Sequence, residues 1–450
     1  MSLHFGAEGS LGILMYIGAI VAVFGSIFWR PVVGIFYLAP LLPLQTMRYR
    51  LNSFPLGASV IGVVLLAVAI GVLRRKRPVF PKTPWTTFLA IYAIFTFVSL
   101  ILGSLYLGAP FPLPGNERFG DWIEYMMMPG LLFLVAAVEP TKLQMKGIIV
   151  MMCLAVLALD RNFLATVSGR DFSAFSYDLR DAGSMGYAGI NGMAAFEAQF
   201  ITLLLALACF EKSRLLRIGY WALAGCSAVC LMYSLSRGGY VAVMAGWLFL
   251  GLVKKRWMVI ALIVFVFTWT TLVPNAVRER VTMTYDAQGG GLDHSAETRL
   301  TLWEDAMQVF DANVIIGSGF NTYAYMHRVG NYQDTHNFFI KVLVETGICG
   351  LALFLWLLGK TFRIGFALSR AAKDPFYASL GLGLASWVVV AFVANLFGDR
   401  WSYMQVCGYM WILAGMVAHA RTVENSVEES EELLSEAGPW PAAASQAAIL

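Results

Sequence analysis

His336 is the residue of this sequence best suited to acid–base chemistry. It lies in the tract Asp334-Thr335-His336-Asn337-Phe338-Phe339, where a polar segment gives way to an apolar run. A neutral imidazole accepts a proton near physiological pH, so this histidine is a candidate general base. Two other interpretations stay open: an interfacial hydrogen-bonding histidine, or a metal pair with Asp334 for which no third ligand is evident. Asn337 and Glu345 would either orient the imidazole or cap and pack the following helix.

Several arginines have the setting of anion-binding groups. Arg237 stands in Ser234-Leu235-Ser236-Arg237-Gly238-Gly239-Tyr240, between two apolar runs, with two glycines that leave room for a ligand or another helix. Arg299 lies in the first turn of an expected helix, and Asp399-Arg400 ends another apolar run. A guanidinium is planar and permanently charged, which suits phosphate or carboxylate. The alternatives are snorkelling to lipid headgroups for Arg237 and a local ion pair for Asp399-Arg400.

The elements that must position these residues are membrane-spanning helices. Of 450 residues, 58% are hydrophobic and only 13% are charged, whereas soluble globular chains carry roughly 25% charged residues. This composition excludes a soluble enzyme and a disordered protein. The near balance of 32 Lys and Arg against 28 Asp and Glu excludes a nucleic-acid binder. We therefore predict an all-α, polytopic helical bundle.

Apolar runs of span length indicate about 12–13 transmembrane helices. The run 32–44 contains Pro40 and Pro43 and would be either a span or a re-entrant segment. The runs lie near 10–29, 32–44, 56–73, 86–108, 121–138, 147–165, 190–210, 218–235, 239–253, 257–273, 336–358, 377–397 and 402–418. They divide the chain into N-terminal spans (1–273), a large loop (274–335), C-terminal spans (336–420) and a flexible acidic tail (421–450).

The positions of the basic residues set the orientation. Lysine-rich connectors alternate with the other loops and are assigned to the cytoplasm. Lys341 is the one lysine on the opposite side, where the other basic residues are arginines. His336, Arg237, Arg299 and Asp399 then all fall on the outer face, which we expect to bind an anion. We predict that Arg237, Arg299 and His336 converge there on one cavity that opens to the bilayer.

The long outer loop 274–335 is expected to be partly helical, because loops of this length are usually functional and structured. Within 297–311, an apolar stripe of Leu300, Trp303, Met307 and Phe310 has helical spacing. Such a helix would lie on the bilayer or cap the bundle. The following Gly317-Ser318-Gly319-Phe320-Asn321 is interpreted as a structural turn, because it lacks the strand and Lys-Ser/Thr ending of a phosphate loop.

The six cysteines all lie in apolar runs, so no disulfide framework is expected. Cys226 and Cys230 share a helix face. We interpret them as packing residues rather than metal ligands, and we expect no metal and no cofactor.

Taken together, these tracts resemble the O-antigen ligase/polymerase superfamily. The residues that carry the resemblance are Ser234–Tyr240, Glu297-Thr298-Arg299 with Trp303, Ile316-Gly317-Ser318-Gly319, His336-Asn337-Phe338 and Glu345-Thr346-Gly347. Asn191 also fits the family pattern. The resemblance covers about 185–360, with only the hydrophobic profile agreeing before that range.

The resemblance implies a bacterial inner-membrane bundle with a large periplasmic loop, acting in lipopolysaccharide or other polysaccharide biosynthesis. It implies transfer of a glycan from undecaprenyl pyrophosphate to an acceptor hydroxyl of lipid A core or another glycan. Arg237 and Arg299 would bind the pyrophosphate, with Asn191, Asn337, Asp399 and Arg400 as further binding residues. His336 would be the base of a metal-independent, inverting reaction.

Two rival functions remain at this point. A polymerase of the same superfamily would use the same donor and another lipid-linked repeat as acceptor, and we favour the ligase. A transporter or flippase would use Glu124, Asp160, Glu197 and Glu345 as a proton relay, but the sequence shows no inverted repeat.

Overall fold

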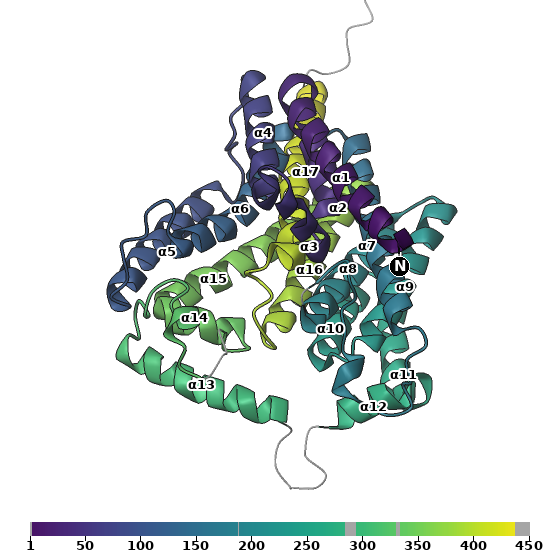
Figure 1. The fold of residues 1–450 in the computed structure, drawn as a ribbon. Coiled ribbons are helices and arrows are strands. Elements are labelled where there is room, and N and C mark those ends of the chain that lie inside the picture. The colour runs from purple at the N-terminus through teal and green to yellow at the C-terminus, as the bar shows by residue number, and fades with distance from the viewer. Residues whose placement is uncertain (1, 188, 284–293, 330–333, 437–450) are drawn as a thin grey trace, which may run out of the picture.

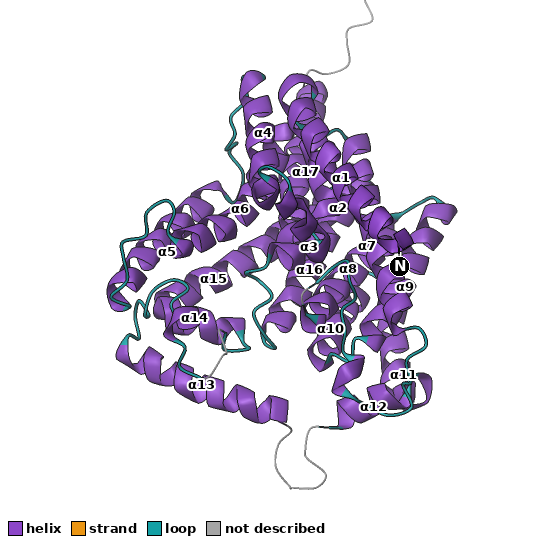
Figure 2. Ribbon diagram, in the orientation of Figure 1, coloured by secondary structure: helices purple, strands orange, loops and turns teal. Residues whose placement is uncertain are grey.

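The structure, a computed structural model, describes residues 2–187, 189–283, 294–329 and 334–436. Throughout these ranges it consists of helices and loops and contains no strand (Figure 2). The predicted all-α class is therefore confirmed. The first helices are α1 (Ser2–Phe24), α2 (Val32–Leu41), α3 (Gln45–Tyr49), α4 (Val60–Arg74), α5 (Thr86–Tyr106), α6 (Glu117–Val138), α7 (Lys142–Val167), α8 (Ile190–Phe210) and α9 (Arg214–Tyr233). They are followed by α10 (Arg237–Val253), α11 (Trp257–Leu272), α12 (Asn275–Thr282), α13 (His294–Ala312), α14 (Tyr323–Met326), α15 (Phe338–Ala371), α16 (Pro375–Asn395) and α17 (Met404–Glu436).

Nine of the described helices are long and apolar enough to cross a membrane, and ten if the bent pair α11 and α12 is one span. The chain is thus a multi-pass membrane protein with fewer such helices than the 12–13 expected. At 1.5 Å per residue, the 10 residues of α2 cover about 15 Å, half of a bilayer core of about 30 Å. The run 32–44 is therefore too short for a straight span. The 17 residues of α10 also fall short, and α17 is not among the nine.

Two helices form the interior of the bundle. In the most apolar stretch of each helix, 89% of the residues of α8 and 78% of those of α16 are buried, against 22% of those of α9. Helices in a bilayer associate through close packing, which small residues at the contact allow, rather than through exclusion from water. Accordingly α8 lies against α9, α10 and α16 near the centre of the molecule (Figure 1), while α9 presents much of its surface to the outside.

Helix starts follow the capping chemistry of the sequence. The Thr141 side chain accepts the backbone N–H of Gln144, whose own side chain accepts the N–H of Thr141, a capping box that begins α7. The Asp374 carboxylate caps α16 by accepting the backbone N–H of Phe376 at 2.8 Å, and it precedes Pro375. These caps fix where the spans begin.

The acidic C-terminal segment begins as a helix rather than as the flexible tail expected from residue 421. α17 continues to Glu436, and residues 437–450 lie outside the described residues. The Glu424 carboxylate accepts the backbone N–H groups of Lys373 at 2.9 Å and Asp374 at 3.2 Å. This part of α17 therefore holds the start of α16.

Candidate active site

A cavity of about 1320 Å³ brings together the two halves of the chain. One wall comes from the segment 45–62 and from α5 and α6, and the other from α14, α15 and the loop before α17. Small-molecule pockets have volumes of roughly 300–1,000 Å³, so this cavity can hold a larger ligand. His336 and Asp399, both candidates from the sequence, line it.

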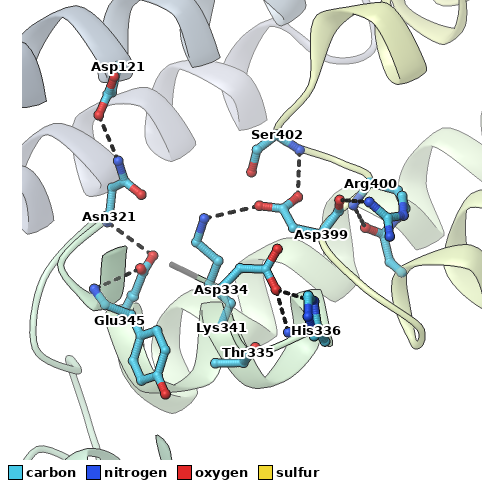
Figure 3. Close-up of polar contacts among 12 residues, drawn as sticks. Asp121, Asn321, Asp334, Thr335, His336, Lys341, Glu345, Asp399, Arg400 and Ser402 are labelled. Atoms are coloured by element: carbon cyan, nitrogen blue, oxygen red, sulfur yellow. Dashed lines mark hydrogen bonds and ion pairs between the residues drawn. The ribbon is translucent and has the colours of Figure 1, made fainter. Parts of the chain in front are cut away.

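His336 and Asp334 form a dyad at the cavity wall (Figure 3). His336 Nδ1 lies 2.7 Å from Asp334 Oδ1, and the same oxygen accepts the backbone N–H of His336 at 2.6 Å. Burial alone would raise the pKa of Asp334, but the hydrogen bond to His336 and the nearby positive charges hold it at about 2. An ionised carboxylate on Nδ1 favours the tautomer in which Nε2 is the basic nitrogen.

Neighbouring residues hold the dyad in place. Trp303 of α13 donates its indole N–H to the carbonyl of Thr335 at 2.9 Å. The Thr335 hydroxyl donates to the carbonyl of Asn337 at 2.7 Å, and the Asn337 side chain caps α15 through Phe339 and Ile340. These contacts hold His336 in a backbone conformation with φ +50°. Few residues other than glycine adopt this left-handed conformation without strain. Of the two roles open for Asn337, the structure shows helix capping.

The loop helix is present, but its buried face differs from the expected stripe. α13 buries Leu302, Ala306 and Val309 against α14 and α15, while Leu300 is 42% exposed. Helical spacing alone fits neighbouring stripes equally well, because the apolar residues of this segment occupy more than one face. The helix caps the bundle beneath α14 and α15 (Figure 1).

A buried ion pair lies beside the dyad. Lys341 Nζ donates to Asp399 Oδ2 at 3.0 Å, and the two side chains are 12% and 2% exposed. Asp399 Oδ1 accepts the backbone N–H of Ser402 at 3.0 Å. Arg400 turns to its own local contacts: its side chain donates to the carbonyl of Asp399, and its backbone N–H to Asn395. Arg400 does not line the cavity.

The tract Glu345-Thr346-Gly347 joins the loop to α15. Gly347 has φ +66° inside the helix, and a Cβ there would lie 2.2 Å from the Ile315 carbonyl. The break lets the backbone N–H groups of Ile348 and Cys349 bind the loop carbonyls of Val314 and Ile315. A non-glycine residue would therefore separate the loop from the helix.

The glycine turn at 317–319 fits against the same site, which confirms its structural interpretation. A Cβ on Gly317 would lie 2.4 Å from the backbone of Glu345, and one on Gly319 would lie 2.1 Å from Gly103 of α5. The Glu345 carboxylate accepts the backbone N–H groups of Asn321 at 3.0 Å and Tyr323 at 3.2 Å. Glu345 therefore holds this turn rather than the imidazole.

Asp121 extends the site to α6. Its carboxylate accepts the Asn321 side-chain amide at 2.9 Å and the Tyr325 hydroxyl at 2.8 Å. These contacts join residues about 200 positions apart in the chain. No pattern in the sequence indicates Asp121, because its proximity to the loop depends on how α6 and α14 pack.

The arginines predicted to converge with His336 do not line the cavity in the described residues. Arg237 begins α10, where it donates to the carbonyl of Met283 at 2.7 Å. Arg299 lies in the first turns of α13. The expected convergence of both guanidinium groups with the imidazole on one cavity wall is thus not seen.

Arg237 belongs instead to a second basic group, which includes Arg180 of the smaller outer loop. Asn191 accepts the Arg180 guanidinium at 2.7 Å and the Ser236 hydroxyl at 3.0 Å. Burial, together with the positive charges of Arg280 and Arg237, lowers the pKa of Arg180 to about 10. Three guanidinium groups that repel one another are suited to an anion, and sequence reasoning had singled out only Arg237 among them.

A family model described as O-antigen ligase matches residues 222–355. The match runs from α9 into α15 and includes Arg237, Arg299, Asp334 and His336, but ends before Asp399. No curated protein matches the chain at a significant level.

Proposed function

We propose that the chain is a glycosyltransferase of the ligase type in the O-antigen ligase/polymerase superfamily, because a family model described as O-antigen ligase matches residues 222–355. It would move a glycan from undecaprenyl pyrophosphate to a hydroxyl of lipid A core or a similar acceptor. The reaction would take place on the periplasmic side of the inner membrane. The observation that carries this proposal is the Asp334–His336 dyad on the wall of a large cavity.

The dyad suits removal of a proton from an attacking hydroxyl. In the proposed step the acceptor O–H donates its proton to Nε2 of His336 while its oxygen forms a bond to the anomeric carbon. The bond from that carbon to the diphosphate oxygen breaks, and the electron pair stays on the undecaprenyl pyrophosphate. Asp334 stabilises the imidazolium that forms. A single displacement of this kind inverts the anomeric configuration.

The charges of the cavity favour the acceptor as its occupant. Its lining contains six carboxylates, from Glu117, Asp121, Glu124, Asp334, Glu345 and Asp399, against the two permanent cations Arg48 and Lys341. Such a lining repels a diphosphate but accepts hydrogen bonds from sugar hydroxyls. We therefore assign the acceptor glycan to the cavity and the diphosphate to the arginines Arg237 and Arg299, with His336 between them in the reacting complex.

Guanidinium groups would neutralise the charge that grows on the leaving diphosphate. Transfer should consequently continue in EDTA, measured well below the unfolding temperature. A specific divalent ion that restores activity lost in EDTA would reject this part of the proposal and return Asp334 and His336 to consideration as ligands.

The function is tested with purified protein in lipid nanodiscs and an undecaprenyl-pyrophosphate-linked oligosaccharide. Lipid A core is supplied in one reaction and withheld in another, and the glycosylated product is identified by mass spectrometry. The ligase proposal expects transfer to lipid A core. Lengthened lipid-linked glycan without lipid A core would identify a polymerase. Movement of the donor across sealed vesicles without any transfer would identify a flippase.

A further inference from the structure

Four side chains from three spans form a polar cluster inside the bundle, outside the residues that line the cavity. Asp160 lies on α7, Glu197 on α8, and Cys226 and Cys230 one turn apart on α9. One ligand atom each from Asp160, Cys226 and Cys230 can be chosen so that all lie within 4.8 Å of one another. The spacing of four residues between the two cysteines places both thiols on the same helix face.

Glu197 supplies an independent observation. Its side chain is fully buried, and neither carboxylate oxygen has a hydrogen-bond partner among the described residues. It lies close enough to interact electrostatically with Asp160, Cys226 and Cys230. Packing alone does not explain a carboxylate in this position, because an unsatisfied buried acid is strongly destabilising.

Asp160 is only partly satisfied. Its Oδ2 accepts the Ser227 hydroxyl at 2.8 Å, whereas Oδ1 is buried without a partner in the described part of the chain. The cluster therefore presents three unpartnered carboxylate oxygens beside two thiols. Carboxylates at this depth must be neutralised, either by protons or by a cation. The two cysteines favour the cation over protons. Sulfur is a soft ligand that binds transition metals, whereas a proton held by two carboxylates needs no thiol nearby.

We propose that Asp160, Glu197, Cys226 and Cys230 form a binding site for a thiophilic divalent metal ion, with Zn²⁺ as the best match. Zinc takes tetrahedral sets of thiolate and carboxylate ligands, with Zn–S near 2.3 Å and Zn–O near 2.0–2.2 Å. Those bonds separate ligand atoms by about 3.5 Å, so the ligand atoms of Asp160, Cys226 and Cys230 would draw together by roughly 1 Å. Glu197 would move toward them to complete the set. The site would tie α9, a peripheral helix, to α7 and α8.

Charge balance makes the proposal more specific. Two carboxylic acids and two thiols are neutral together. Zinc binds thiolates rather than thiols, so uptake of one Zn²⁺ releases the two thiol protons of Cys226 and Cys230. The two thiolates balance the charge of the ion, and Asp160 and Glu197 keep their protons and coordinate through their carbonyl oxygens, which leaves a neutral complex in the low-dielectric interior. Cys226 is only partly buried, so its thiol is open to a labelling reagent in detergent. The apparent affinity for Zn²⁺ should therefore rise about 100-fold for each unit of pH, over the range in which both thiols are protonated in the metal-free protein.

The test uses the full-length protein in detergent, reduced and stripped with a chelator, with ZnCl₂ as the only added ligand. Bound zinc is measured by mass spectrometry of the element after gel filtration, and thiol access by maleimide labelling. We expect one zinc per chain, protection of Cys226 from the label and a higher unfolding temperature. Wild-type protein that takes up no zinc above a buffer control would overturn the proposal, and the carboxylates would then hold protons.

Variants assign the ion to these residues. Cys226→Ser combined with Cys230→Ser should abolish uptake, and Glu197→Gln should weaken it at least tenfold. Cys209→Ser on α8 is the matched control, because it removes a thiol outside the cluster and should leave stoichiometry unchanged. Zinc retained by the double variant, or lost in the control, would contradict the assignment. If the double variant does not fold, the wild-type stoichiometry and labelling still decide the question.

Discussion

His336 Nδ1 and Asp334 Oδ1 lie 2.7 Å apart at the wall of a cavity built from both halves of the chain. Their spacing of two residues is what allows one carboxylate oxygen to bind both the imidazole and the backbone N–H of His336. With its pKa held near 2, Asp334 stays ionised at any pH used for an enzyme assay. The carboxylate thus fixes both the orientation and the tautomer of the proposed base.

Asp334→Asn tests that role. The amide can keep the backbone hydrogen bond but cannot stabilise an imidazolium, so turnover should fall by roughly 100- to 10,000-fold. Donor binding should change by less than threefold. The measurement is a single-turnover rate beside an equilibrium donor titration, on protein whose unfolding temperature matches the wild type. Full turnover in Asp334→Asn would show that the carboxylate only holds the loop.

Arg237→Lys and Arg299→Lys test the assignment of the diphosphate. Each lysine keeps the charge but loses the two-pronged donor, a loss of about 1.5–3 kcal/mol per hydrogen bond and roughly 10- to 100-fold in donor affinity. Arg328→Lys is the control, because Arg328 is an outer-loop arginine paired with Asp305 at 2.9 Å. Normal donor affinity in both Arg237→Lys and Arg299→Lys would remove these residues from the binding site.

Lys341 and Asp399 should behave as a buried ion pair. Lys341→Met leaves the Asp399 carboxylate, which is 2% exposed, without its cation. It should lower the free energy of unfolding by about 3–5 kcal/mol. Adding Asp399→Asn removes the stranded charge while keeping an acceptor for Ser402, so it should restore at least half of the loss. Denaturant titration in one detergent measures Lys341→Met, Asp399→Asn and the double variant. Strictly additive losses would mean that the two side chains are not coupled.

We predict that only the part of the acidic segment that contacts α16 contributes to stability. Removing residues 431–450 should leave stability and transfer unchanged, because the composition cannot bury a core. Removing 422–450 also takes away Glu424 and should cost about 0.5–2 kcal/mol, as for the loss of a helix cap. Glu424→Ala in the full chain isolates this contact. Equal stability of the two truncations would show that Glu424 contributes nothing.

Much of the fold was predictable because span length and hydropathy are local properties of the sequence. His336 was also found locally, as a titratable residue between a polar loop and an apolar run. The opposite cavity wall was not, since Asp121 meets Asn321 about 200 residues away, and no pattern in either segment reports that contact. Nine of the described helices reach span length, against 12–13 apolar runs in the sequence, because an apolar run such as 32–44 does not reveal where its helix ends.

The arginines show a further limit of the sequence. Arg180, Arg237 and Arg280 form one group, yet they come from the loop after α7, the start of α10 and the short helix α12. Outer-face arginines had been recognised as a set by residue type alone. Which of them gather depends on how α10, α12 and the loop after α7 pack, and that information is not contained in spacing along the chain.

A comparison of single-turnover rates tests whether His336 is the base of glycan transfer. His336→Ala and His327→Ala are measured with a bound undecaprenyl-pyrophosphate-linked donor and saturating acceptor. Both histidines line the cavity, but only His336 is paired with a carboxylate in the proposed mechanism. We predict that the single-turnover rate of His336→Ala falls by roughly 100- to 10,000-fold while its donor binding is unchanged. The rate of His327→Ala should stay within threefold of wild type. A near-normal rate in His336→Ala would contradict it.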